Sequence, residues 1–163
     1  YNTSKMNHSK MKIKKGRPGV NPNIEFAIKT SQAYSAVCKP LCQELKLPQT
    51  AFDILMFLAN NPDYKTARDI VEVRHIKANL VSMYVDKLVQ EGYLERYAVA
   101  GDRRKTKLLC TGKADPVIRR GRAVQNAFFK RLLNNTDAAD REVFFRTMEV
   151  IGKNLDEIIK ENT

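Results

Sequence analysis

The stretch HIKANLVSMYVDKLVQEGYLERYAVAGDRRKTKLLCT, residues 75–111, changes its hydrophobic period part-way along. From Lys77 onward, apolar residues recur at the spacing of one helix face, until Gly92 supplies a natural C-terminal cap. Over residues 93–99 and 105–111 the period falls to two, which is typical of strands, and AGDRR lies between them as a turn. The stretch therefore predicts a helix followed directly by a β-hairpin.

Further helices are predicted just before this stretch. Leu47-Pro48 breaks the chain, and the strongly apolar helix that follows is ended by NNPD at residues 60–63. Thr66 followed by Asp69 is typical of a helix cap and predicts a short helix over residues 67–73. A tight turn at residues 74–76 joins it to the helix that Lys77 opens. Two short helices joined by a tight turn and followed by a hairpin predict a winged helix-turn-helix over residues 47–111.

The flanking segments, residues 23–46 and 112–163, are also helical in pattern, so the predicted fold is mainly α with one small β-hairpin. Asn23 is expected to cap the first helix, and Pro40 is expected to kink or divide it. Pro116 is expected in the first turn of a helix that starts near Thr111. The last helix, over residues 138–160, has an apolar stripe too wide for one small neighbour, which predicts a dimer seam, with packing inside one subunit as the alternative. That seam contains Phe144, Met148, Ile151, Leu155 and Ile158.

The net charge of +11 indicates a polyanion as partner, either nucleic acid or an anionic membrane surface. No apolar run approaches the roughly 18–20 residues that a membrane span requires, and we expect no membrane association. Residues 1–22 hold basic side chains and no acidic one, and we expect an arm without helix or strand. Within it, KIKKGRPG at residues 12–19 is similar to the AT-hook core. The arm could contact DNA, clasp a dimer or remain solvated.

A helix that lies in the major groove of DNA needs an apolar back and a front of small polar residues. In the helix from Lys77, the back is supplied by Leu80, Val81, Val85 and Leu88. Asn can read adenine, Ser adapts to either partner, and Met or Ala can touch a thymine methyl group. We therefore expect DNA contacts from Lys77, Ala78, Asn79, Ser82 and Met83, and further contacts from Thr66 and Lys87.

The turn AGDRRK is expected to form the tip of the wing. Arg103, Arg104 and Lys105 suit the minor groove, whose negative potential attracts arginine. Asp102 would be repelled by phosphates unless it pairs inside the protein, so we expect it to orient Arg104. The alternative is a solvated charged hairpin.

The segments DIVEVRHIKANLVSMYVDKLVQEGYLERY and GDRRKTKLLCT together resemble the MarR family of winged-helix regulators. The Asp-Arg-Arg turn, with its spacing to Thr111, is the more specific part, and the flanking helices match the family plan. Cys110, Ala114 and Pro48 depart from the residues that are usual in the family, and these departures concern packing and helix caps. The basic arm is not part of the family pattern.

The resemblance implies a sequence-specific transcriptional regulator that acts as a homodimer on double-stranded DNA, with repression as the expected role. Residues 23–46 and 112–163 would intertwine with the second subunit. Two recognition helices about 34 Å apart would then read a pseudo-palindromic operator whose half-sites are one helical turn apart.

The resemblance also implies that a small lipophilic or phenolic effector could bind between the dimer helices and the DNA-binding lobe. By rough location in the chain, the expected ligand contacts are Tyr34, Phe52, Met56 and His75. Core packing explains each of these four residues equally well.

The three cysteines, Cys38, Cys42 and Cys110, fit a chain kept in the reducing cytoplasm. Their simplest interpretation is as small buried apolar residues, and a redox-responsive regulator that uses Cys38 or Cys42 is an alternative. No zinc-ligand set, catalytic triad, phosphate-binding loop or paired carboxylate motif occurs, so we predict no metal, no cofactor and no enzymatic activity. A winged-helix module that binds proteins is a further alternative. It would be marked by an acidic or apolar front, whereas residues 77–83 are basic and polar.

Overall fold

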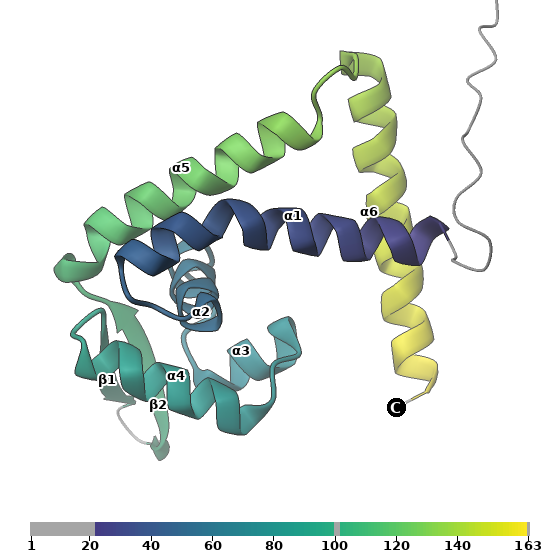
Figure 1. Ribbon diagram of the computed structural model, residues 1–163. Coiled ribbons are helices and arrows are strands. Elements are labelled where there is room, and N and C mark those ends of the chain that lie inside the picture. The colour runs from purple at the N-terminus through teal and green to yellow at the C-terminus, as the bar shows by residue number, and fades with distance from the viewer. Residues whose placement is uncertain (1–21, 100–101, 163) are drawn as a thin grey trace, which may run out of the picture. The chain divides into compact units, whose positions relative to one another are not determined.

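The computed structural model describes residues 22–99 and 102–162, and within these it places the side chains of residues 24–98 and 106–162. It confirms the predicted fold class, which is mainly α with a two-stranded hairpin. The described residues form two compact units, one up to Ala36 and the other from Val37 onward. The elements in chain order (Figure 1) are α1 (Pro22–Glu44), α2 (Gln49–Asn60), α3 (Ala67–Arg74), α4 (Ala78–Gln90), β1 (Leu94–Val99), β2 (Asp102–Cys110), the 3₁₀ turn η1 (Gly112–Ala114), α5 (Asp115–Leu132) and α6 (Ala138–Glu161).

Helix α2 is the centre of the core in the second unit. Its side chains from Ala51 to Leu58 are buried with the exception of Asp53, and the helix packs against α4, α5 and β2. Burial of each large apolar side chain contributes about 1.5–3 kcal/mol of transfer free energy. The surrounding elements complete the core with Ile70, Val81, Val85, Leu88, Leu94, Leu108, Val117 and Ile118.

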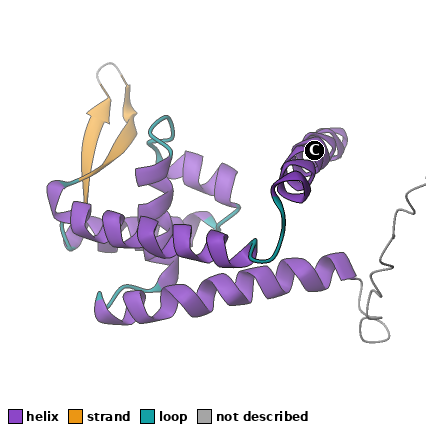
Figure 2. Ribbon diagram, turned by 90° about the horizontal axis from the view of Figure 1, so that it is seen from above, coloured by secondary structure: helices purple, strands orange, loops and turns teal. Residues whose placement is uncertain are grey.

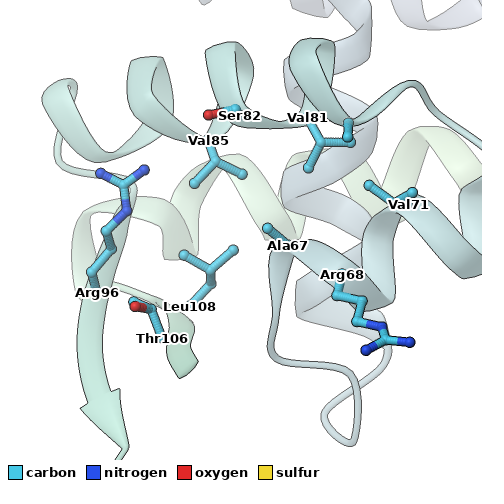
Figure 3. A pocket seen from close by; sticks show the side chains of 10 residues that line it. Ala67, Arg68, Val71, Val81, Ser82, Val85, Arg96, Thr106 and Leu108 are labelled. Carbon is cyan, nitrogen blue, oxygen red and sulfur yellow. The ribbon is translucent and has the colours of Figure 1, made fainter. Parts of the chain in front are cut away.

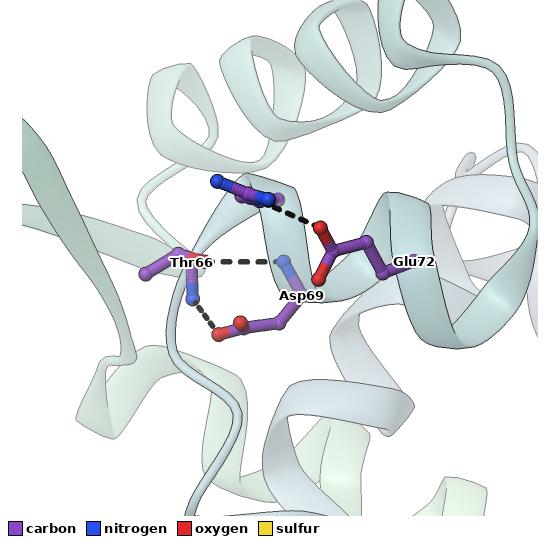
Figure 4. A network of polar contacts seen from close by, with 4 residues as sticks. Thr66, Asp69 and Glu72 are labelled. Atoms are coloured by element: carbon purple, nitrogen blue, oxygen red, sulfur yellow. Dashed lines mark hydrogen bonds and ion pairs between the residues drawn. The ribbon is translucent and has the colours of Figure 1, made fainter.

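Helix α3 begins with the predicted capping arrangement (Figure 4). The Asp69 amide donates to the Thr66 hydroxyl at 3.1 Å, and the Thr66 amide donates to the Asp69 carboxylate at 2.8 Å. These reciprocal bonds satisfy backbone donors that a helix start leaves without partners. The helix ends at His75, whose φ of 51° is left-handed and turns the chain toward α4.

The hairpin starts earlier on its second strand than the sequence predicts. We expected a turn over residues 100–104 and a strand from Lys105, but β2 already begins at Asp102, which pairs with Val99. The next pair, Ala98 with Thr106, leaves residues 103–105 in an irregularity of the ladder. Because of this bulge, the basic residues 103–105 belong to β2 but have no paired residue on β1.

Hydrogen bonds connect the two strands of the hairpin where α4 leads into it. Gly92 has a φ of 74°, which confirms the predicted cap, because this left-handed conformation favours glycine. The Thr111 hydroxyl donates to the Gly92 carbonyl at 2.6 Å, and the Thr111 amide donates to the Tyr93 carbonyl at 3.1 Å. The two ends of the hairpin are thereby held together at its base.

Three predictions about helix ends and one about burial are corrected. Helix α1 begins at Pro22, so Asn23 lies inside it, because proline lacks only an N–H that the first turn does not use. Pro40 lies within α1 and does not divide it into two helices. Helix α5 begins at Asp115 after a 3₁₀ turn, with Pro116 in its first turn as predicted. Leu80, expected on the buried back of α4, is 38% exposed.

Helix α6 has no buried residue, although it carries many large apolar side chains. Of the predicted seam, Phe144 is 39% exposed and Ile158 is 55% exposed. Packing inside the described chain therefore does not cover this stripe. Across residues 22–99 and 102–162, no helix has both the length and the apolar character needed to cross a bilayer.

Candidate nucleic-acid interface

Helix α4 has one buried and one exposed face. Val81, Val85 and Leu88 are at most 2% exposed and fix the helix to the core. On the other side, the side chains at the start of the helix all face outward, and Met83 is 50% exposed. These outward residues are Lys77, Ala78, Asn79, Ser82 and Met83, which are the predicted front.

A groove of about 340 Å³ separates this part of α4 from α3 and the wing (Figure 3). Its floor is apolar, and its polar groups belong to Arg68, Ser82, Arg96 and Thr106. Figure 2 shows the hairpin projecting from the helices. The structure thus brings Ala78 and Ser82 beside the start of α3 and one face of the wing.

The sequence analysis did not single out Arg68, Arg96 or Thr106. Strand alternation could have found Arg96, since Leu94 is buried and residues two apart on a strand share a face. Arg96 forms an ion pair with Asp86 of α4. Arg68 pairs with Glu72 at 2.6 Å on the surface of α3, and the hydrogen bond that its guanidinium donates to the Glu72 carboxylate raises the pKa of Arg68.

Two of the predicted DNA contacts already have partners within the protein. Thr66 is half-buried, and its hydroxyl accepts the capping bond from Asp69. Lys87 is half-buried and forms an ion pair with Glu91 at 2.5 Å. Both keep hydrogen-bonding capacity, because a hydroxyl can donate while it accepts and an ammonium group has three donors.

The predicted wing-tip contacts are placed only by their backbone. Asp102, Arg103, Arg104 and Lys105 belong to β2, but their side chains lie outside the described residues. The expected pairing of Asp102 with Arg104 lies outside them as well. The same holds for residues 1–21 of the basic arm.

Comparison with known proteins connects this arrangement to one family. Residues 45–105 match the sequence model of the MarR family, and this range covers α2 to α4 and the start of the wing. The transcriptional regulator PA3341 has a similar structure, with 26% identity, a TM-score of 0.73, and coverage of 83% of this chain and 98% of its own. Over residues 45–105, this chain is therefore similar to the MarR family of regulators.

Solved structures with lower sequence identity share the fold. A MarR-family regulator from Listeria monocytogenes, crystallised with a 26mer DNA, is 13% identical with a TM-score of 0.74, covering 85% of this chain and 91% of its own. MepR from S. aureus, solved as a DNA complex, is 12% identical with a TM-score of 0.68. The match covers 83% of this chain and 98% of MepR. No curated protein matches the sequence.

Within the second compact unit, the structure does not gather the predicted ligand contacts Phe52, Met56 and His75 in one place. Phe52 and Met56 are at most 1% exposed inside the core, while His75 is exposed at the end of α3. Tyr34 belongs to the other compact unit. A second cavity of about 390 Å³ lies between the end of α1 and α5, and neither cavity is lined by any of the four, whose ligand role stays a prediction.

The cysteines of this chain are poorly suited to redox sensing. Cys38 and Cys42 are buried. Burial, with smaller contributions from the nearby Cys38 and Asp53, raises the pKa of the Cys42 thiol to about 11. Burial and Asp115 also raise the pKa of Cys110, although Arg122 lowers it. Reactive thiols instead have a lowered pKa, so the structure favours the packing interpretation.

Proposed function

We propose that the chain is a homodimeric repressor that reads a pseudo-palindromic operator through α4. The observation that carries the proposal is the exposed front of α4, which lies beside a projecting hairpin, while Val81, Val85 and Leu88 on the opposite face are buried. The major groove admits one helix of this kind. The MarR-family structures from Listeria monocytogenes and S. aureus were each solved with DNA, which supports a duplex as the partner.

Within the front of α4, we assign base reading to Asn79 and Ser82, whose side chains are exposed. Asn79 can make a bidentate contact to adenine, and Ser82 can adapt to a donor or an acceptor on the base edge. Met83 and Ala78 would contact thymine methyl groups. Lys77, at the N-cap position, makes no side-chain capping bond and would contact a phosphate.

The proposed backbone and minor-groove contacts surround this front. Thr66 and Lys87 would bind phosphates and fix the register of α4 on the duplex. From the sequence, Arg103, Arg104 and Lys105 of the wing would enter the minor groove, and Asp102 would orient Arg104. The basic arm would add charge that holds the chain near the DNA.

The proposal of a dimer is supported by α6. Its side chains Phe144, Met148 and Ile151 are each at least 39% exposed, so a stripe of this kind requires a second surface to cover it. We propose that residues 23–46 and 112–163 form the dimer region and residues 47–111 the DNA-binding domain. A two-fold dimer would place the two α4 helices about 34 Å apart.

We further propose that a small lipophilic or phenolic effector releases the protein from its operator in the cytoplasm. The cavity between α1 and α5 supports an effector of this class, because Val37, Leu41 and Val124 give it apolar walls. Glu44 and Arg120 add polar groups at the same cavity. The raised thiol pKa of Cys42 speaks against release by cysteine oxidation.

Selection from random duplexes, followed by gel shifts at two salt concentrations, tests the proposed function. We expect an enriched pseudo-palindrome with half-site centres about 10–10.5 base pairs apart. Binding to it should weaken steeply with salt, because several phosphate contacts release counterions. Failure to enrich any sequence, or affinity that does not change with salt, would refute DNA reading by this chain.

A further inference from the structure

Helix α5 is joined to the C-terminal end of α2 by one arginine. The Arg122 guanidinium donates to the Ala59 carbonyl at 2.8 Å and to the Asn60 side-chain oxygen at 2.9 Å. The Asn60 amide in turn donates to Gln125 at 3.1 Å. Two positions of α5, almost one turn apart, thereby hold the last two residues of α2.

The chemistry of this contact suits an orienting role. A helix leaves its last carbonyl groups without partners, and a cation near that end is favoured by the helix dipole. The planar guanidinium presents its donors in a fixed geometry, so it can bond a main-chain carbonyl and a side-chain oxygen only in one orientation. Arg122 therefore restricts the rotation of α5 about the end of α2.

A second observation places a close backbone approach at the same junction. Gly121, the neighbour of Arg122, is buried against α2. A Cβ atom on Gly121 would lie 2.4 Å from the Met56 sulfur and 3.1 Å from the Phe52 ring. A side chain at position 121 would have to displace the Met56 side chain, and Arg122 bonds to α2 beside the same contact.

We propose that Arg122 is a positioning residue that sets the separation of the two recognition helices, and hence the half-site spacing that the dimer accepts. The proposal rests on the proposed function. Helix α2 packs against α4, while α5 leads along the chain to the apolar stripe of α6. The junction therefore lies between the DNA-reading part and the proposed dimer part. A change of angle there would be carried to both copies of α4.

The test measures affinity for duplexes in which the spacing between half-site centres varies by single base pairs, and for a duplex with one half-site. The variant is Arg122→Gln, and Arg119→Gln is the matched control, because Arg119 is an exposed arginine of the same helix. We expect the wild type and the control to prefer one spacing. In Arg122→Gln, the ratio of the affinity for the preferred spacing to the affinity for the other spacings should fall about three- to tenfold. The affinity for the single half-site should stay unchanged.

The variant Arg122→Lys distinguishes positioning from a simple effect of charge. Lysine keeps the positive charge but lacks the planar fork. We expect Arg122→Lys to lose the spacing preference as Arg122→Gln does. Recovery of the wild-type preference by lysine would overturn the positioning role, and so would a loss of affinity that is equal for every spacing and for the single half-site.

A distance measurement separates failure of this inference from failure of the proposed function. A spin label on Gln90→Cys, at the exposed end of α4, is placed in a Cys110→Ser background that leaves only the buried thiols. We expect a narrow distance distribution between subunits for the wild type and a broader one for Arg122→Gln. A wild type with neither a defined distance nor duplex binding would refute the function and this inference together. A defined distance and spacing preference that are the same in both proteins would overturn the inference alone.

Discussion

The Arg96 guanidinium of β1 is paired with the Asp86 carboxylate of α4, one turn after Ser82. The pair joins the wing to the helix that carries the proposed base-reading residues. It also neutralises an acidic group that would otherwise face phosphates. Arg96 and Asp86 are 42% and 61% exposed, so the pair should contribute no more than about 1 kcal/mol to folding.

Removal of this pair should therefore affect DNA binding more than stability. We expect Arg96→Ala to weaken operator binding roughly tenfold and to change the melting temperature little. The exchange Asp86→Arg with Arg96→Asp should restore part of the affinity, because it rebuilds the link with reversed ends. Fluorescence anisotropy and thermal melting of Asp86→Arg, Arg96→Asp and the exchange that combines them complete a double-mutant cycle. Additive effects in that cycle would show that the pair does not couple wing and helix.

The exposed Asn79 should determine which bases are preferred. We expect Asn79→Ala to lose about 1–3 kcal/mol of discrimination at one position of each half-site, since the bidentate contact to adenine is removed. Selection from random duplexes with the variant would reveal the relaxed position, and Lys153→Ala, an exposed α6 residue, serves as the control. Equal weakening on every duplex would instead assign Asn79 to the DNA backbone.

The sequence predicted the order of elements because each element had a local signal. Thr66 with Asp69 marked the start of α3, and Gly92 marked the end of α4. The hairpin was less predictable, because the bulge that admits Asp102 into β2 depends on pairing across the strands and not on local residues. Pro40 does not divide α1, which was one of its two predicted effects, because tertiary context decides whether a helix continues through a proline.

The front of α4 could be predicted because a 3.6-residue period separates Val81 and Val85 from Asn79 and Ser82. The residues that were missed come from other elements. Arg68 and Thr106 reach the groove only after α3 and the hairpin fold against α4. The junction of Arg122 with Ala59 joins residues 63 positions apart, and no local pattern encodes that contact.

The cap of α3 gives folding stability a defined pH dependence. Partial burial alone would raise the pKa of Asp69, but hydrogen bonds from Thr66 and Lys65 bring that pKa below its usual value. A lowered folded-state pKa adds stability above the unfolded value of about 3.9, and this is lost as pH falls through the folded-state value. Near neutral pH, we expect the free energy of unfolding of the wild type to exceed that of Asp69→Asn by about 1 kcal/mol. Urea unfolding should show this difference shrinking below about pH 4; a gap that is constant down to pH 2 would contradict the assignment.

The close approach at Gly121 should make a small substitution costly. Alanine gains about 1 kcal/mol of helix propensity over glycine, but overpacking against the buried Met56 costs about 1–3 kcal/mol. We expect Gly121→Ala to be destabilising by up to about 2 kcal/mol, measured by denaturant unfolding. In a Met56→Ala background, the same substitution should lose its penalty. Gly112→Ala, where no atom lies within 4 Å of the added carbon, is the control. An unchanged penalty in the Met56→Ala background would exclude that side chain as its cause.

The buried thiols should react slowly in the native protein. With a pKa of about 11, Cys42 is almost entirely protonated at pH 8, and reagent must also reach a buried site. We expect a disulfide reagent at pH 8 to modify Cys38 and Cys42 only after denaturant is added. Peptide mapping identifies the modified residues, with Cys110 as the internal reference. Rapid native modification of Cys42, with a loss of DNA binding, would revive the redox alternative.

The absence of any buried residue on α6 has a consequence for the life of the protein in the cell. A helix without a buried side chain gains little stability beyond its own propensity, so α6 in a lone chain should fray readily. A newly synthesised subunit that has not yet dimerised would then expose this apolar helix to proteases. Proteolysis would remove unpaired subunits, so the cellular amount of the regulator would follow the number of assembled dimers.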